Sequence, residues 1–330
     1  MVWVTLFLTF DLIMFGAFTR LTDSGLGCPD WPGCYGHANP LQAHEDINAA
    51  ETAMPTGPVT VVKAWIEMIH RYLAMGIGVL IVALMVIAWR RWLQSERREI
   101  KFSPLFPTLL FGFVCIQGAF GAWTVTMKLQ PVIVTIHLLL GMTLLALLSW
   151  FGSRLSDHPT VPKSAAEICT PATLALVLLI IQIALGGWVS TNYAALACTD
   201  FPLCHGELFP QMDFANGFSL WRDLGKTVHG DYLPFPALTA IHWTHRAFAF
   251  VVLVLVAWVA FRAFKIDALR TTARWLLSMI ALQFAIGIST VFLKLPLALA
   301  VAHNGGAALL LALLVMLNYK ISIATKTASN

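Results

Sequence analysis

Long apolar stretches dominate this chain of 330 residues and restrict it to one class of fold. A helix that crosses the hydrocarbon core of a bilayer needs about 20 mostly apolar residues. The chain is 58% hydrophobic and 12% charged, and its apolar runs are continuous rather than alternating, which predicts helices and not a membrane barrel. We expect eight spans, near residues 3–20, 61–89, 105–126, 131–151, 171–190, 237–261, 274–293 and 297–319.

The distribution of charge predicts the orientation of these spans. Lys and Arg residues gather on the cytoplasmic side of membrane proteins. The two long connections, 21–60 and 191–236, carry five acidic residues each, and their only basic residues are Arg222 and Lys226. We therefore expect both connections outside a bacterial-type plasma (inner) membrane and both termini in the cytoplasm. The net charge of +4 then reflects topology, and no nucleic-acid partner is expected. The basic residues expected inside are Arg90, Arg91, Arg97, Arg98, Lys101, Arg154, Lys163, Arg262, Lys265, Arg270, Arg274, Lys320 and Lys326.

The chain contains an internal repeat. Residues 16–36 align without a gap to residues 186–206 at an offset of 170, with seven of 21 positions identical. Each half holds four spans, so the halves share one orientation. We predict an all-α integral membrane protein of two pseudo-symmetric four-helix bundles, residues 1–160 and 161–330. Further matches along the repeat are His70-Arg71 with His245-Arg246, and His137 with His303.

Two cysteines recur in each copy of the repeat. Cys28 and Cys34 lie in the first long connection, and Cys198 and Cys204 lie in the second. The outer side of a membrane permits disulfides, whereas zinc prefers four ligands in tighter spacing. We interpret each pair as a disulfide within its loop, with metal binding as the alternative.

Four histidines lie at one depth within predicted spans, where an ionisable side chain is costly and usually functional. Each lies roughly 9 to 14 Å below the outer boundary at the rise of a helix. Two histidines on alternate helices of a bundle, at equal depth, suit the two axial ligands of a haem. A hydrogen-bonded packing role and a zinc site are the alternatives. These residues are His70, His137, His245 and His303.

Charged neighbours accompany these histidines. Arg71 and Arg246 could neutralise haem propionates, or only snorkel or bind a loop. Glu67 precedes His70 by one helical turn, whereas the matching residue of the second half is His242. A carboxyl group beside a ligand suits proton transfer. We expect one reactive pocket, in the first half, and one electron-transfer pocket in the second.

The phrases TRLTDSGLGCPDWPGCYG, EMIHR, ACTDFPLCHG, THR and AHNGG resemble the haem A synthase family. The resemblance extends over essentially the whole chain, and the first two phrases are specific. It implies an eight-helix membrane enzyme of two four-helix halves. Such an enzyme converts haem O into haem A by oxidising a ring methyl to a formyl group through successive hydroxylations.

The resemblance also implies roles for individual residues. The second half would hold a haem b cofactor on His245 and His303, and the first half would hold the substrate haem O on His70 and His137. Glu67 stands where the family has its functionally important acid. The cysteine pairs match as loop disulfides, the first of which is sometimes given a redox role.

Partners and alternative functions follow from this interpretation. We expect the electrons to reach a quinone or another membrane acceptor, and a haem O synthase could supply the substrate from the lipid bilayer. A di-haem b-type electron-transfer cytochrome is one alternative, although Glu67 and His242 break the equivalence of its two sites. A quinone-linked thiol oxidoreductase that uses the loop cysteines is the other.

Overall fold

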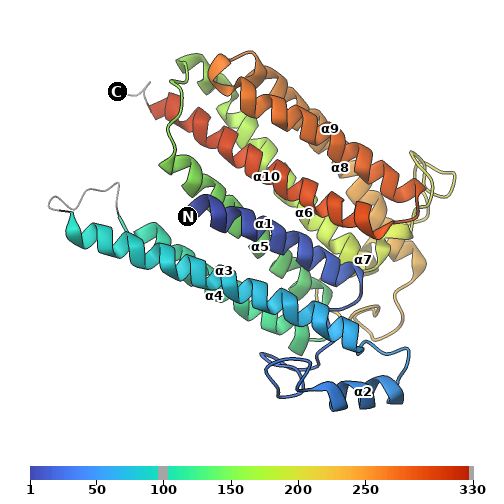
Figure 1. Ribbon diagram of the computed structural model, residues 1–330. Helices are drawn as coiled ribbons and strands as arrows, with labels where there is room; N and C mark the ends of the chain where they lie inside the picture. The colour runs from blue at the N-terminus through green and yellow to red at the C-terminus, as the bar shows by residue number, and fades with distance from the viewer. Residues whose placement is uncertain (96–102, 327–330) are drawn as a thin grey trace. The chain divides into compact units, whose positions relative to one another are not determined.

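Eight long helices dominate the part of the chain that the computed structural model describes, residues 1–95 and 103–326, with side chains described to residue 323 (Figure 1). Each of the eight is long and apolar enough to cross a membrane, which confirms the predicted spans. The protein is therefore a multi-pass, all-helical membrane protein. The helices are α1 (Val2–Leu21), α3 (Val61–Gln94), α4 (Leu105–Thr126), α5 (Pro131–Leu155), α6 (Cys169–Thr191), α8 (Phe235–Phe264), α9 (Arg270–Phe292) and α10 (Leu297–Lys326).

Helix α3 shows how the ends of the spans are set. Its first turn is capped by the Thr60 hydroxyl, which accepts the backbone N–H of Lys63 at 3.2 Å. It continues to Gln94, past the predicted limit at residue 89, and its last turns include the polar residues Arg90 and Arg91. The next basic residues expected inside, Arg97, Arg98 and Lys101, lie outside the described residues, as does the side chain of Lys326.

The turns between α4 and α5 and between α9 and α10 are the same. Lys128 and Leu129 have φ of 51° and 57°, and Lys294 and Leu295 have φ of 56° and 61°, a left-handed conformation that side chains rarely adopt. The N–H of each leucine reaches back to a helix carbonyl, over 2.8 Å and 2.7 Å. A proline then begins or precedes the next helix, so both helix pairs are joined by tight antiparallel turns.

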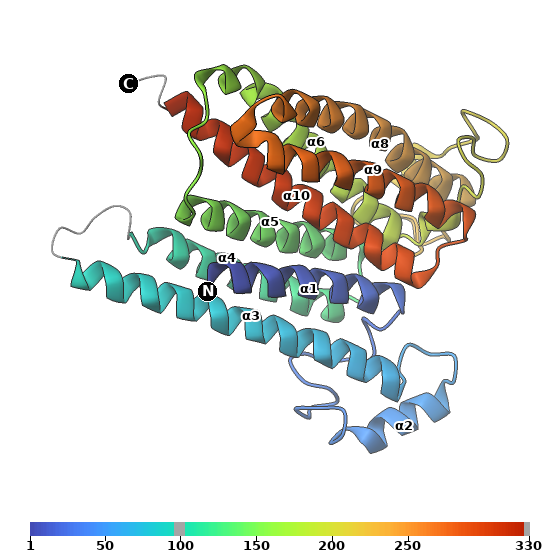
Figure 2. The same ribbon diagram turned by 45° about the horizontal axis from the view of Figure 1, so that its top comes forward.

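The chain divides into two compact units (Figure 2). Unit 1 comprises Met1–Leu129 and Ile136–Leu148, and unit 2 comprises Gln130–Thr135 and Ser149–Asn330. In unit 2, α6 packs on α8, α8 on α9, α9 on α10 and α10 on α6, which closes a four-helix ring. In unit 1, α3 packs against both α1 and α4. The division falls within α5, whereas the predicted halves meet at residue 160.

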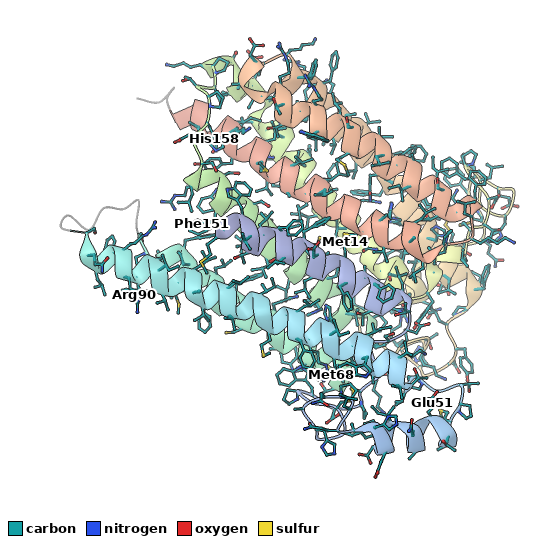
Figure 3. All side chains as sticks on the ribbon, viewed as in Figure 1. Met14, Glu51, Met68, Arg90, Phe151 and His158 are labelled. Carbon is teal, nitrogen blue, oxygen red and sulfur yellow. A yellow bond between two sulfur atoms is a disulfide. The ribbon has the colours of Figure 1, made fainter. Side chains whose placement is uncertain are left out.

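The two long connections contain short helices that the sequence analysis did not predict, α2 (His44–Ala53) and α7 (Phe214–Gly217). In unit 1, α2 lies at the end of α3 that carries Met68, and Arg90 lies at the other end (Figure 3). The acidic connection and the basic end of α3 are thus on opposite sides of this unit. This separation is what the charge distribution along the chain leads one to expect of a spanning bundle.

Candidate functional site: paired histidines beneath two latched loops

Each long connection contains a small loop closed by a disulfide, which confirms both predicted pairs. Cys28 bonds to Cys34, and Cys198 bonds to Cys204. The four cysteines are at most 2% exposed. Among the residues described, no group of three or more His, Cys, Asp or Glu side chains is placed to hold a metal ion directly. Each loop is therefore closed by a buried disulfide bond.

A carboxylate shapes each loop from within. Asp30 and Asp200, which match in the repeat, each accept two backbone N–H groups. The bonds from Gly206 and His205 lower the pKa of Asp200, so this carboxylate stays charged at a lower pH than an isolated aspartate does. Gly36 and Gly206 have φ of 75° and 77°, where a glycine is favoured. The two loops thus have the same internal design.

The residue one turn before the first histidine holds each loop to its helix. Glu67 is 4% exposed, and its Oε2 atom accepts the backbone N–H of Cys28 at 2.9 Å. In the second half, Nδ1 of His242 accepts the backbone N–H of Cys198 at 3.1 Å. The two halves of the sequence differ at this position, which predicts different functions for Glu67 and His242. In the structure both side chains accept a backbone N–H of a loop cysteine. We call this contact the latch.

The arginines complete the latch. Arg71 forms an ion pair with Glu67 and also donates to the carbonyl oxygens of Pro32 and Gly33, at 3.1 and 2.6 Å. Arg246 donates to the matching carbonyls of Pro202 and Leu203, at 3.3 and 3.0 Å. Both arginines therefore bind a loop, and their contact with haem propionates stays a prediction. Nη1 of Arg246 is buried and has no hydrogen-bond partner within the described chain.

The burial of the disulfides leads to a prediction about thiol labelling. In the native protein without reductant, N-ethylmaleimide should leave all four loop cysteines unmodified, because they are bonded and covered. The positive control is the same protein after denaturation and reduction. Mass spectrometry should then detect all six thiols, those of the four loop cysteines together with those of the free Cys115 and Cys169. Labelling of Cys28 or Cys34 in the native, unreduced protein would contradict the disulfide.

All four predicted histidines pack against a glycine of a neighbouring helix. A Cβ atom placed on that glycine would lie only 3.0 to 3.2 Å from the imidazole ring, so a larger residue would push the ring away. Each histidine is half-buried and keeps a surface that a ligand could cover. The pairs are Gly16 with His70, Gly121 with His137, Gly186 with His245, and Gly287 with His303.

A glutamine precedes three of these glycines by one helical turn, a pattern that the sequence analysis missed. The amide Nε2 of each glutamine donates to the backbone carbonyl of the histidine on that glycine, at distances of 2.9 to 3.2 Å. The signal was present in the sequence as the repeated phrase Q-x-x-x-G, one span before each of these histidines. The three glutamines are Gln117, Gln182 and Gln283, in QGAFG, QIALG and QFAIG.

The residues present fit a haem held between two imidazoles. His70 on α3 and His137 on α5 belong to unit 1, and His245 on α8 and His303 on α10 belong to unit 2. The Nδ1 atoms of His137 and His303 are buried without a hydrogen-bond partner in the part of the chain that the structure describes. Two neutral nitrogen ligands from helices of one bundle suit the axial positions of an iron porphyrin.

The fold and the site together define a class: a duplicated multi-pass membrane protein with a glycine-backed histidine pair in each half. Residues 1–315 match the COX15-CtaA family, described as cytochrome oxidase assembly protein. The chain belongs to this family.

Similar proteins from several bacteria carry one name. The chain is 43% identical over 319 residues to the heme A synthase of Shewanella oneidensis, which covers 96% of this chain and 94% of that protein. It is 28% identical over 345 residues to the heme A synthase of Rhodopseudomonas palustris, covering 96% and 89% of the two chains. It is 29% identical over 347 residues to that of Erythrobacter litoralis, covering 98% and 97%. The similarity therefore extends over both halves of the repeat.

Proposed function

We propose that this protein is a haem A synthase, which oxidises the ring methyl of haem O to a formyl group by successive hydroxylations within the membrane. One observation carries the proposal: a glycine-backed histidine pair recurs in both halves of a chain whose relatives are named heme A synthase. Two sites are what such a reaction needs, one for the haem that is modified and one for a haem that carries electrons.

We assign haem O to His70 and His137, and a haem b cofactor to His245 and His303. The chemical difference between the two latches supports this assignment. The first half carries the Glu67 carboxyl group, ion-paired with Arg71, where the second half has His242. Oxidation of a methyl group releases protons, so the substrate suits the half that holds the carboxyl group.

The chain's own groups would carry out the remaining tasks. Conversion of a methyl into a formyl group takes up one oxygen atom, and with water as its source it releases four protons and four electrons in successive steps. Haem b held by His245 and His303 would supply a one-electron carrier. The Glu67 carboxylate, with Arg71 as its counter-charge, would accept protons at the end of the first site. The disulfide loop, which is latched to both side chains, would close that end to bulk water.

The membrane arrangement belongs to the same proposal. We place the two disulfide loops outside a bacterial inner membrane and both termini in the cytoplasm, because the basic connections lie at the opposite ends of the helices. Haem O, which is apolar over most of its surface, would enter from the bilayer. A quinone or another membrane acceptor would take the electrons, and a haem O synthase would supply the substrate.

The test of this proposal is the identity of the bound haems. The protein should be purified from membranes that contain haem O, and its pigments should be extracted and separated by chromatography. We expect haem b together with haem O and its hydroxylated or formylated derivatives. A parallel preparation from cells without haem O should contain haem b alone.

The two alternative functions give different results in the same experiment. A di-haem b-type cytochrome would contain two equivalents of haem b and no modified haem even when haem O is present. A thiol oxidoreductase would require its cysteines to exchange with external thiols, and the buried disulfides disfavour this. Haem b alone in two equal sites would overturn the proposal.

A glycine substitution tests the site directly. Gly121→Leu should displace His137, because even a Cβ at this position would lie 3.2 Å from the ring. Overpacking of about 1–3 kcal/mol corresponds to a loss of haem O occupancy of roughly five- to a hundredfold. Gly118→Leu, in the same helix, has nothing within 4 Å of its Cβ and is the matched control. Bound haem O is measured by extraction, and equal occupancy in the two variants would contradict the packing argument.

A further inference from the structure

The helix that packs behind His70 lacks the glutamine that the other three have. Leu12 precedes Gly16 by four residues, and the offset of 170 aligns Leu12 with Gln182, which precedes Gly186. Helix α1 packs on α3 as α6 packs on α8, so the two positions face equivalent partners (Figure 2). A leucine has no N–H to donate. His70 is therefore the one histidine of the four whose backbone carbonyl accepts no such hydrogen bond from a glutamine in the described structure.

Gln182 contacts its histidine at two points. Its Nε2 atom donates to the backbone carbonyl of His245 at 3.1 Å and lies 3.0 Å from Nδ1 of the same residue. One side chain thus contacts both the backbone and the ring of the proposed ligand. Groups behind a metal-binding imidazole fix the orientation of its ring, and their loss changes the affinity for the metal.

The ring of His70 also lies differently on its glycine. The Cβ position of Gly16 is closest to Nε2 of His70, at 3.0 Å, whereas the other three glycines are closest to Cε1 of their histidines. Among the described residues no glutamine contacts the ring of His70, whereas Nε2 of Gln182 lies 3.0 Å from Nδ1 of His245. The aromatic ring of Phe15 stacks on the ring of His70 instead, with ring centroids 6.4 Å apart and planes 10° apart. Stacking permits a sliding or turning motion that a hydrogen bond opposes.

We propose that Leu12 makes His70 an exchangeable haem ligand, and that Gln182 makes His245 a fixed one. This inference rests on the proposed function, in which one haem turns over and the other stays. Leu12 and Gln182 are positioning residues that act through the histidines. The difference between them lets the two halves of the repeat hold their haems for different times. A substrate site must release its product, whereas a cofactor site must retain its haem.

The experiment exchanges the two residues. Leu12→Gln supplies the missing donor in unit 1, and Gln182→Leu removes it from unit 2. Leu12→Met and Gln182→Met are the matched controls, because methionine has a similar length and no N–H. The purified protein, loaded with haem O and haem b, is mixed with excess apomyoglobin. The haem that remains bound is identified by chromatography as a function of time.

We expect Leu12→Gln to slow the release of haem O by roughly fivefold, about the effect of one added hydrogen bond, while Leu12→Met leaves the rate unchanged. Gln182→Leu and Gln182→Met should both accelerate the release of haem b by about the same factor. The inference is overturned if either exchange leaves its rate within about twofold of the unmodified protein. Thermal unfolding followed by circular dichroism separates a local change from a general loss of structure.

Failure of the inference differs from failure of the proposed function. If the proposed function is wrong, the unmodified protein contains no modified haem even when it is purified from membranes that contain haem O. If only the inference is wrong, the unmodified protein releases haem O and haem b at two rates, and these rates do not respond to the exchange of Leu12 and Gln182.

Discussion

His303→Ala should remove most of the haem b from the purified protein and leave its helical structure intact. Loss of one of two axial ligands should lower retained haem b at least about tenfold, since even groups behind a ligand change metal affinity about 10- to 100-fold. Alanine is smaller than histidine, so it adds no clash at Gly287. Reduced-minus-oxidised absorbance spectra and extracted haem per mole of protein measure the effect.

Two variants serve as controls for His303→Ala. His137→Ala should lower bound haem O and retain haem b, because His137 belongs to unit 1. His229→Ala alters an exposed residue of the second connection and should change neither haem. If His303→Ala retains the full haem b spectrum, the cofactor does not lie on this residue and the assignment to the second half is wrong.

Glu67→Gln should abolish most haem A formation while haem b stays bound. The glutamine side chain can still accept the N–H of Cys28, so the latch persists, but it lacks the charge that pairs with Arg71 and receives a proton. Proton transfer by a positioned side chain contributes about 10²- to 10⁴-fold to a rate. We therefore expect a decrease of at least about a hundredfold, measured as the ratio of haem A to haem O in membranes.

The matched control for Glu67→Gln lies at the equivalent position of the repeat. His242→Gln also keeps an acceptor for the backbone N–H of a loop cysteine, and it removes no carboxylate. It should leave haem A formation within about threefold of the unmodified protein. Undiminished haem A formation by Glu67→Gln would exclude the acid role. Simultaneous loss of haem b or of the first disulfide would instead indicate that Glu67 acts only through the latch.

The fold was largely predictable from the sequence because lipid permits few solutions. A continuous apolar run must form a helix, so all eight spans were found, and errors were confined to ends such as Gln94 of α3. The two disulfides followed from a repeated spacing of cysteines. Neither α2 nor α7 was predicted, because their short polar sequences lack an apolar periodicity that distinguishes helix from loop.

The details of the site were less predictable because a span that is apolar on all sides does not reveal which face points where. Arg71 and Glu67 were recognised as neighbours of His70, but their contacts with Gly33 and Cys28 depend on how the loop folds back over α3. The three glutamines could have been found from the repeated phrase Q-x-x-x-G. Their partners could not have been predicted, because these are backbone carbonyl groups, which every residue has.

The left-handed turns at Lys128-Leu129 and Lys294-Leu295 join two pairs of spans into helical hairpins. A connection of this length keeps the end of α4 beside the start of α5, and the end of α9 beside the start of α10. The glycine contacts of His137 and His303 lie between the two arms of these hairpins, so one ligand of each pair is positioned as soon as its hairpin has formed.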